Sequence, residues 1–291
     1  MKHILIAALF LFLGQAPLFA EEQEEITVST FYERLTPYGS WTEDPDYGWV
    51  FQPKEIEVGW RPYCDNGHWT WTDAGWYWVS DYKWGWACFH YGRWHNKPHR
   101  GWVWVPDCTW GPAWVSWREC DTHIGWAALP PGATFTAGVF SFRGHVDIEF
   151  GLGAGDFIFV GCNRFLDIHL HRHATPRKQV VNIYNNTTII KNTYVQNNTT
   201  IINNGVSTKV IEKHTGRKIQ ASKIESVHKP RESQEPGKVN SYRPKVRNEA
   251  PVTPKKFQER PDRQRQPERP QRVRPKQPQP QTKHRKADFE D

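Results

Sequence analysis

Carboxylates and imidazoles that could act as acids, bases or partners of a nucleophile are scattered through the first half of the chain. They are Glu43, Asp44, Asp46, Asp73, Asp81, His90, His95, His99 and His123. A glycosidase needs two carboxylates facing across a cleft, and a hydrolase needs a nucleophile beside a base; neither has a recognisable local motif here. Aspartate in the stretches EDPDYG and TDAG is also what a turn would use. The sequence therefore predicts no catalytic residue and a non-enzymatic protein, with an unrecognised hydrolase as the weaker alternative.

Two short patterns could bind ligands but are better explained as ordinary structure. The run GLGAG at 151–155 is followed by the apolar stretch DFIFV, so it has no helix N-terminus to hold a phosphate and is predicted to be a hairpin turn. His169, His171 and His173 would share one face of an extended segment. Metal sites normally draw ligands from more than one element, so a solvent-facing polar strand is predicted. No metal and no cofactor are predicted.

The N-terminus has the layout of a secretory signal peptide. It carries Lys2, an apolar run from Ile4 to Leu13, and a small residue at Ala20. The run is short for a membrane span, so we expect residues 1–20 to be removed and the mature chain to begin at Glu21. An uncleaved anchor is the alternative. The sequence thus predicts an exported protein, periplasmic or associated with the cell envelope.

Tryptophan defines the next part of the chain, because all 16 tryptophans lie between Trp41 and Trp126. Four segments share one plan: a short strand with Trp, a turn rich in Pro, Asp, Asn or Gly, and a second strand with a Gly-Trp step. The steps fall at Trp49, Trp76, Trp102 and Trp126, with spacings of 27, 26 and 24 residues. Such a period indicates repeated supersecondary units, here antiparallel β-hairpins. A mainly β repeat domain is predicted over residues 30–133.

Side-chain alternation predicts which rings are buried. In first strands such as HWTWT, Trp alternates with polar residues, so one face is expected to be wet. In second strands such as WVWV both faces are apolar. Rings of the second strands are therefore predicted to be core; they are Trp78, Trp102 and Trp104. Rings of the first strands are the candidates for stacking on a sugar; they are Trp41, Trp69 and Trp94. A buried Trp removes about 150–250 Å² from water, so packing explains most of the tryptophans.

Several motifs in order carry a family resemblance: LTPYGSW, DPDYGWVFQP, GWRPY, HYGRW, GWVWVP, WGPAWVSWR and GWAALPPG. They resemble an uncharacterised, Trp-rich domain-of-unknown-function family of exported bacterial proteins. The resemblance covers residues 30–175 and, more loosely, the chain to about 227. It implies export and an envelope location but no chemistry. The chain departs from the family's pattern at Cys88, where a proline would be usual, so the disulfides are a local feature.

Export permits disulfides, and five cysteines are present. Cys108 and Cys120 bracket one predicted strand, and Cys64 and Cys88 precede equivalent strands in adjacent repeats. We therefore expect the pairs Cys108–Cys120 and Cys64–Cys88, with Cys162 free. The absence of a C-x-x-C pair argues against a zinc ribbon.

The rest of the chain is predicted in three parts. Residues 134–175 are expected to add β-strands packed on the repeats. Residues 176–228 repeat NNTTII and are expected to form an Asn/Thr-rich β segment, or a partly ordered linker, with one short helix between Ser207 and Gly216. Residues 229–291 hold 18 Lys and Arg against 9 Asp and Glu and are rich in Pro and Gln, so a disordered basic tail is expected.

These features favour a structural and interaction scaffold of the envelope. The alternative is a carbohydrate-binding module for cell-wall glycans that uses Trp41, Trp69 and Trp94. The expected partners of the tail are anionic envelope polymers or a lipid surface, and peptidoglycan or polysaccharide for the rings. Nucleic acid is not expected, because a signal peptide takes the chain out of the cytoplasm.

Overall fold

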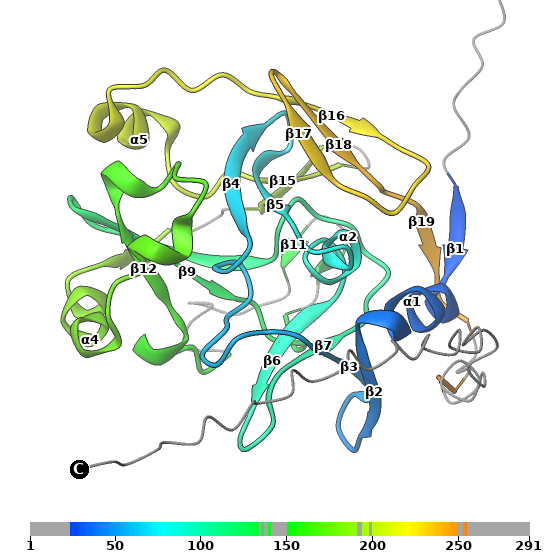
Figure 1. Cartoon of the computed structure of the whole chain (residues 1–291). Helices are drawn as coiled ribbons and strands as arrows, with labels where there is room; N and C mark the ends of the chain where they lie inside the picture. The colour runs from blue at the N-terminus through cyan, green and yellow to red at the C-terminus, as the bar shows by residue number, and fades with distance from the viewer. Residues whose placement is uncertain are drawn as a thin grey trace, which may run out of the picture. The chain divides into compact units, whose positions relative to one another are not determined.

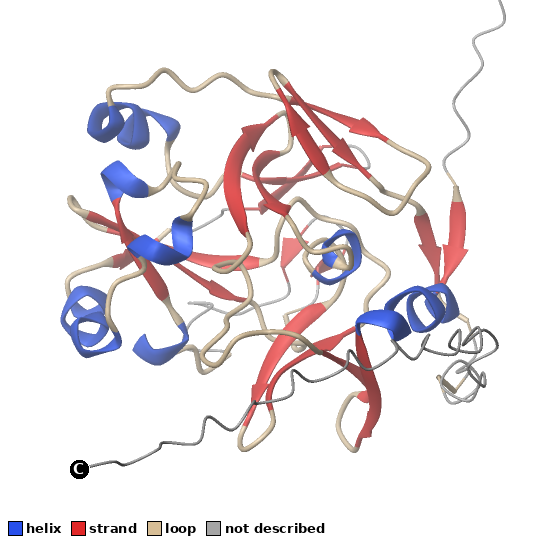
Figure 2. Cartoon of the chain, viewed as in Figure 1, coloured by secondary structure: helices blue, strands red, loops and turns tan. Residues whose placement is uncertain are grey.

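The computed structural model describes residues 24–133, 135–136, 139–140, 150–190, 194–197, 200–249 and 253–254. It is mainly β, as predicted, with short strands paired in several small sheets and a few short helices (Figure 1, Figure 2). The predicted signal peptide lies outside the described residues. All the described residues belong to one compact unit that ends at residue 258.

Four antiparallel hairpins form between residues 39 and 128, one in each predicted repeat. They are β2 (Gly39–Asp44) with β3 (Gly48–Pro53), β4 (Gly67–Thr72) with β5 (Gly75–Ser80), β6 (Arg93–Lys97) with β7 (Gly101–Val105), and β8 (Val115–Glu119) with β9 (His123–Ala128). Each second strand carries the Gly-Trp step of its repeat. The predicted hairpin repeats are therefore confirmed.

Each hairpin places an aromatic pair directly across its two strands, and the second hairpin has a further pair, Trp71 with Trp76. The pairs that enter the shared core are Trp41 with Phe51, Trp69 with Trp78, Trp94 with Trp104, and Trp117 with Trp126. In the first three hairpins a glycine stands two residues before the first Trp, and the opposing ring lies over it. A Cβ on Gly67, for example, would fall 2.6 Å from the Trp78 ring. The recurring Gly-x-Trp motif is thus a packing device, in which glycine leaves room for the ring of the partner strand.

The four hairpins share one aromatic core. Twelve of the 16 tryptophans are buried. At its centre the Trp69 ring lies 4.7 Å from that of Trp117 and 5.7 Å from that of Trp126, between ring centroids. Several buried indoles donate to backbone carbonyls, as Trp104 Nε1 does to Tyr91 O at 2.7 Å. Such rings bury a large apolar area while their single polar group is satisfied.

Further strands extend the hairpins into three sheets of four strands. The first and third hairpins join in the order β2-β3-β7-β6. The fourth adds β12 (Ile158–Gly161) and β13 (Thr188–Ile189), and the second adds β14 (Tyr194–Asn197) and β15 (Thr200–Asn203). β10 (Phe135–Thr136) and β11 (Val139–Phe140) pair with each other.

The Asn/Thr-rich segment is anchored in the core by one buried asparagine. Asn203 accepts a hydrogen bond from Trp117 Nε1 at 2.9 Å and donates to Trp76 O at 3.2 Å. Both tryptophans belong to hairpins, so this segment packs on the repeats and does not act as a loose linker at this point.

Helices occur where the sequence showed a cap and also where it did not. They are α1 (Val28–Leu35), α2 (Gly85–Cys88), α4 (Arg177–Asn185) and α5 (Thr208–Thr215), with 3-10 turns η1 (Thr36–Tyr38), η2 (Ala154–Asp156), η3 (Cys162–Arg164) and η4 (Leu170–His173). The helix predicted between Ser207 and Gly216 is confirmed, with Gly216 left-handed at φ 67°. α1, α2 and α4 were not predicted. Among the described residues, no helix has the length and hydropathy needed to cross a bilayer.

The prediction that disorder begins at Lys229 is wrong for residues 229–249. This stretch contains β17 (Ser233–Glu235), β18 (Lys238–Ser241) and β19 (Lys245–Arg247); β18 pairs with β16 (Lys223–Ser226) and β17, and β19 pairs with β1 (Glu25–Thr27). Val239, Tyr242 and Val246 are buried. Widely spaced apolar residues between Pro, Lys and Arg were enough to dock the strands. Of the tail beyond Glu249, only residues 253–254 are described.

Candidate functional site

The three rings predicted to stack on sugars are buried. Trp41, Trp69 and Trp94 expose 3, 2 and 1 % of their surface, so their prediction as ligand-binding residues is wrong. The reason is the hairpin register: residues directly opposite each other share a face of the sheet. Because Trp69 faces Trp78 and Trp94 faces Trp104, the rings of both strands enter the same core. The polar neighbours lie on the other face.

The rings that do reach the surface lie elsewhere. Four tryptophans are half-buried: Trp49, Trp71, Trp102 and Trp110. Trp102 was predicted to be core, and this prediction is wrong, whereas Trp78 and Trp104 are core as predicted. Trp49 and Trp102 each follow a turn glycine, whereas Trp76, in the equivalent place of the second hairpin, is fully buried.

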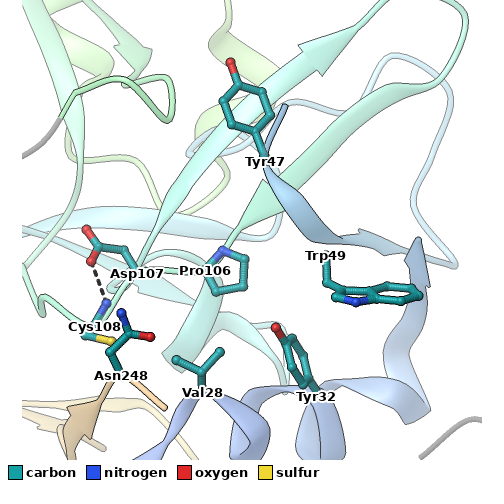
Figure 3. Close-up of a pocket in the computed structure, with 8 residues that line it drawn as sticks. All are labelled: Val28, Tyr32, Tyr47, Trp49, Pro106, Asp107, Cys108 and Asn248. Carbon is teal, nitrogen blue, oxygen red and sulfur yellow. Dashed lines mark hydrogen bonds between the residues drawn. The ribbon is translucent and has the colours of Figure 1, made fainter. Parts of the chain in front are cut away.

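One of these rings, Trp49, lines a pocket of about 180 Å³. The pocket is lined by Val28, Tyr32, Tyr47, Trp49, Pro106, Asp107, Cys108 and Asn248. Figure 3 shows Val28 and Tyr32 rising from α1, with Trp49 on one side and Asp107, Cys108 and Asn248 on the other. The volume is small beside typical ligand pockets of about 300–1,000 Å³, so it suits one ring-sized group.

Four segments that are distant in the sequence build this pocket. β3 pairs antiparallel with β7 through Phe51 and Trp104, so Trp49 comes next to the chain that leaves β7 at Pro106. β1 pairs parallel with β19, which brings Asn248 beside the start of α1. These pairings are long-range, which is why the sequence did not single out the pocket.

The polar groups of the pocket are a carboxylate, an amide and a thiol. Asp107 accepts a hydrogen bond from the Cys108 backbone N–H at 2.6 Å, and its other oxygen lies 4.0 Å from Arg93 Nη1. Burial, together with the charge of Asp107, raises the pKa of the Cys108 thiol to about 11. The thiol is therefore protonated near neutral pH and is a poor nucleophile. Aromatic rings beside a carboxylate and an amide suit the stacking and hydrogen bonding of a hydroxylated ring.

An ion pair holds the tip of the first hairpin in place beside this pocket. Asp44 and Lys97 pair directly, and Asp44 Oδ1 also accepts the backbone N–H groups of Asp46 at 3.1 Å and Tyr47 at 3.3 Å. Burial raises the pKa of Asp44, but these bonds outweigh it and the pKa lies below its ordinary value. The Tyr47 ring then lies 5.5 Å from the His95 ring. Aspartate in EDPDYG thus forms the turn, as predicted.

The comparisons with known proteins give one match. Residues 32–133 match DUF6600, a family of unknown function. The resemblance to a domain-of-unknown-function family is thereby confirmed. No curated protein and no solved structure matches the chain. The DUF6600 region spans all four hairpins, whereas Val28 and Asn248 of the pocket lie outside it.

A buried polar network joins the DUF6600 region to the strands after residue 222. His90 Nδ1 lies 2.9 Å from Gly111 O, so this nitrogen carries a proton and donates. His90 Nε2 lies 2.7 Å from Glu232 Oε1, with both side chains almost fully buried. Tyr77 hydroxyl donates to the same carboxylate at 2.5 Å and lies 2.9 Å from Ser241 Oγ. The network has no access to a substrate, so its role is to fasten Glu232 against the second hairpin.

The predicted polar strand of three histidines is not a strand. His169 lies in a turn, and His171 and His173 lie in η4, which Leu170 anchors by its burial. His173 Nε2 pairs with Asp167 Oδ2 at 3.0 Å. Within the described part of the chain no group of three or more His, Cys, Asp or Glu side chains is placed to hold a metal.

The GLGAG run leads through η2 into β12. Gly151 has a left-handed φ of 65°, which suits a turn. The strand expected before the run lies outside the described residues, so the hairpin turn predicted here stays a prediction.

All five cysteines are free thiols in the structure, so neither predicted disulfide is formed. Cys64 and Cys88 are buried among the aromatic rings, and burial raises the pKa of both thiols, that of Cys64 to about 12. Cys108 lines the pocket. Cys120 lies instead at the turn between β8 and β9, beside Cys162. Spacing along the sequence could not show these neighbours.

Proposed function

We propose that the chain is an exported, non-enzymatic protein of the bacterial cell envelope that acts as a structural and interaction scaffold. The observation that carries the proposal is the aromatic core, in which twelve tryptophans are buried between four hairpins. Most of the tryptophans hold the hairpins together. The side chains of the network around Glu232 are buried and are not accessible to a substrate. Half-buried rings at the hairpin ends leave surfaces for partners.

The location is tested by fractionation and mass analysis of the producing cell. The signal-like residues 1–20 support cleavage after Ala20, so the protein should appear in the periplasmic or envelope fraction with a mass that starts at Glu21. Cytosolic protein that retains residues 1–20 would overturn the proposed location.

The basic tail is the proposed contact with anionic envelope polymers or lipid. Residues 250–291 hold 12 Lys and Arg against 6 Asp and Glu. Co-sedimentation with anionic vesicles or cell-wall fragments should weaken steeply with salt, because screening acts over about 8–10 Å at 0.1–0.15 M. Truncation after Glu249 keeps the docked strands and removes the tail. Retention that is unchanged by this truncation would count against the tail.

We propose carbohydrate binding at the Trp49 pocket as the second candidate. Its support is the combination of the Tyr47 and Trp49 rings with the Asp107 carboxylate around a cavity sized for one ring. We expect Trp49→Ala to lower retention on peptidoglycan or polysaccharide.

Trp102→Ala is the matched control, since Trp102 occupies the equivalent place after the turn glycine of another hairpin and lines no part of this pocket. Equal retention of glycan by wild type and both variants would refute carbohydrate binding at the pocket. Loss in Trp49→Ala alone, with the unfolding transition retained, would support it.

A further inference from the structure

The structure brings two cysteines together that sequence spacing keeps apart. Cys120 follows β8, and Cys162 follows β12 and opens η3. β12 pairs antiparallel with β9 and ends with Gly161 opposite His123. The ladder continues one step further, because Cys162 N donates to Thr122 O at 2.9 Å. Cys162 is thereby fixed against the turn that begins at Cys120.

The Cys162 thiol points at the backbone of its neighbour. Its Sγ lies 3.9 Å from Cys120 O and 4.0 Å from Asp121 O. The Cys120 thiol lies 3.6 Å from Thr122 Oγ1 at the same turn. A disulfide needs Cβ atoms about 3.5–4.5 Å apart, and both sulfurs now contact oxygen atoms of the same turn, so each must turn toward the other before they can bond.

The other three cysteines are less suited to pairing. Cys64 and Cys88 expose 3 and 1 % of their surface inside the aromatic core, where an oxidant has no access. Cys108 contributes to the pocket between α1 and β7, a different part of the fold from the β8–β9 turn. Cys120 is half-buried and is the thiol of the pair that an oxidant reaches first.

We propose that Cys120 and Cys162 form a disulfide that ties the β8–β9 turn to the start of η3. The crosslink replaces the pairs expected from the sequence and leaves the other three cysteines as thiols. It is independent of any glycan bound at the pocket, and export would matter only by supplying an oxidising compartment.

Oxidised glutathione can serve as the oxidant that forms this disulfide. The Cys120 thiolate attacks one sulfur of oxidised glutathione, forming a mixed disulfide and releasing one glutathione thiolate. The Cys162 thiolate then attacks the Cys120 sulfur of the mixed disulfide, which forms the Cys120–Cys162 bond and releases the second glutathione thiolate. Two protein thiols are oxidised, one glutathione disulfide is reduced, and the two protons pass to the two glutathiones.

The second step sets the pH dependence. Burial and, less strongly, the neighbouring Cys120 raise the pKa of the Cys162 thiol to about 11. The groups that face this thiol are Cys120, Glu119 and Asp121, all on the β8–β9 side. Since only the thiolate attacks, closure of the disulfide should accelerate about tenfold per pH unit below that pKa.

The test uses the full folded chain and oxidised glutathione. After oxidation, denaturation and alkylation, three cysteines should be alkylated and non-reducing peptide mapping should recover a Cys120–Cys162 linked peptide. Cys108→Ser should form the same crosslink. Cys162→Ser should instead stop at a glutathione adduct on Cys120, which identifies Cys120 as the thiol that reacts first.

Three results would overturn the proposal: a Cys108–Cys120 peptide, alkylation of all five cysteines after oxidation, or an unchanged pattern in Cys162→Ser. Retention of the unfolding transition shows that each variant is folded during oxidation. A Cys120–Cys162 crosslink formed in vitro, with free thiols in protein taken from the cell, would support the proposed pair while counting against the proposed oxidising location.

Discussion

The first and second hairpins follow the same sequence plan but are buried to different extents. In the second hairpin every residue of β5 is buried, because the aromatic core covers one face and Tyr77 and Val79 on the other meet Ile224 and Val239 of the late strands. In the first hairpin Tyr47 remains 37 % exposed and Trp49 lines an open pocket. The repeat thus specifies a hairpin, whereas its neighbours decide which rings become core.

The two hairpins also differ in the polar contacts that they make. The late strands cover the second hairpin and also bring Glu232 beside His90 and Tyr77, so a buried polar contact accompanies the apolar one. At the first hairpin the corresponding charged pair joins the buried carboxylate of Asp44 to Lys97, whose side chain is partly exposed. Substitutions in the second hairpin and its cover should therefore destabilise the fold more than substitutions at the first hairpin's tip.

The largest effect is expected from the cross-strand aromatic pairs. Trp94→Ala and Trp104→Ala should each lower the free energy of unfolding by about 3–5 kcal/mol, because each removes a large buried ring from a closely packed core. Urea unfolding followed by circular dichroism measures both. A Trp94→Ala variant that loses less than about 1 kcal/mol would contradict the shared face of the two rings.

The next largest loss of stability is expected from substitution of Glu232. Glu232→Ala leaves His90 buried without its partner, and breaking a buried pair costs about 3 kcal/mol or more. The matched control is Glu235→Ala three residues later, an exposed glutamate whose loss should cost about 0.5–1 kcal/mol or less. If both variants unfold at the same urea concentration, the contact between Glu232 and His90 does not contribute to stability.

Lys97→Met tests the tip of the first hairpin and should cost about 1–3 kcal/mol at pH 7, because it leaves the buried Asp44 carboxylate with only its backbone donors. The pKa of Asp44 is lowered in the folded state, so its ionised form stabilises the fold above its unfolded pKa of about 3.9, and this contribution is lost as the pH falls through the folded value. Unfolding at a series of pH values should show a full difference from wild type at pH 7 that vanishes in acid. Lys83→Met, at an exposed lysine, should match wild type throughout.

The smallest effect on stability is expected from Tyr47→Ala, within about 0.5–1 kcal/mol, because its ring is the most exposed of the pocket. If the pocket binds carbohydrate, Tyr47→Ala should nevertheless weaken glycan retention. A variant with wild-type retention, measured on the same polysaccharide that Trp49→Ala fails to bind, would restrict the binding surface to Trp49 and its other neighbours.

Much of the hairpin architecture could be predicted from local sequence. The Gly-Trp steps and turn residues located four hairpins, and Ser207 and Gly216 bounded α5. The error on Trp41, Trp69 and Trp94 could also have been avoided from sequence, because a two-residue turn at Asp73 and Ala74 already places Trp69 opposite Trp78. Alternation within a single strand does not show this pairing.

Other features had no usable local signal. Composition suggested disorder after Lys229, yet Val239, Tyr242 and Val246 find buried places there. α4 was hidden in an Asn-rich stretch that suggested strands, and the extended run of histidines proved to be a turn and η4.

By itself the sequence determined the hairpins, since a turn and its flanking strands bring residues only a few positions apart into register. Only the tertiary structure decided that Glu232 reaches His90, that Cys120 lies beside Cys162, and that Trp49, Asp107 and Asn248 line one pocket. Each of these contacts joins segments far apart in the chain. Their partners are selected by the shape and polarity of surfaces that exist only once the hairpins have packed together.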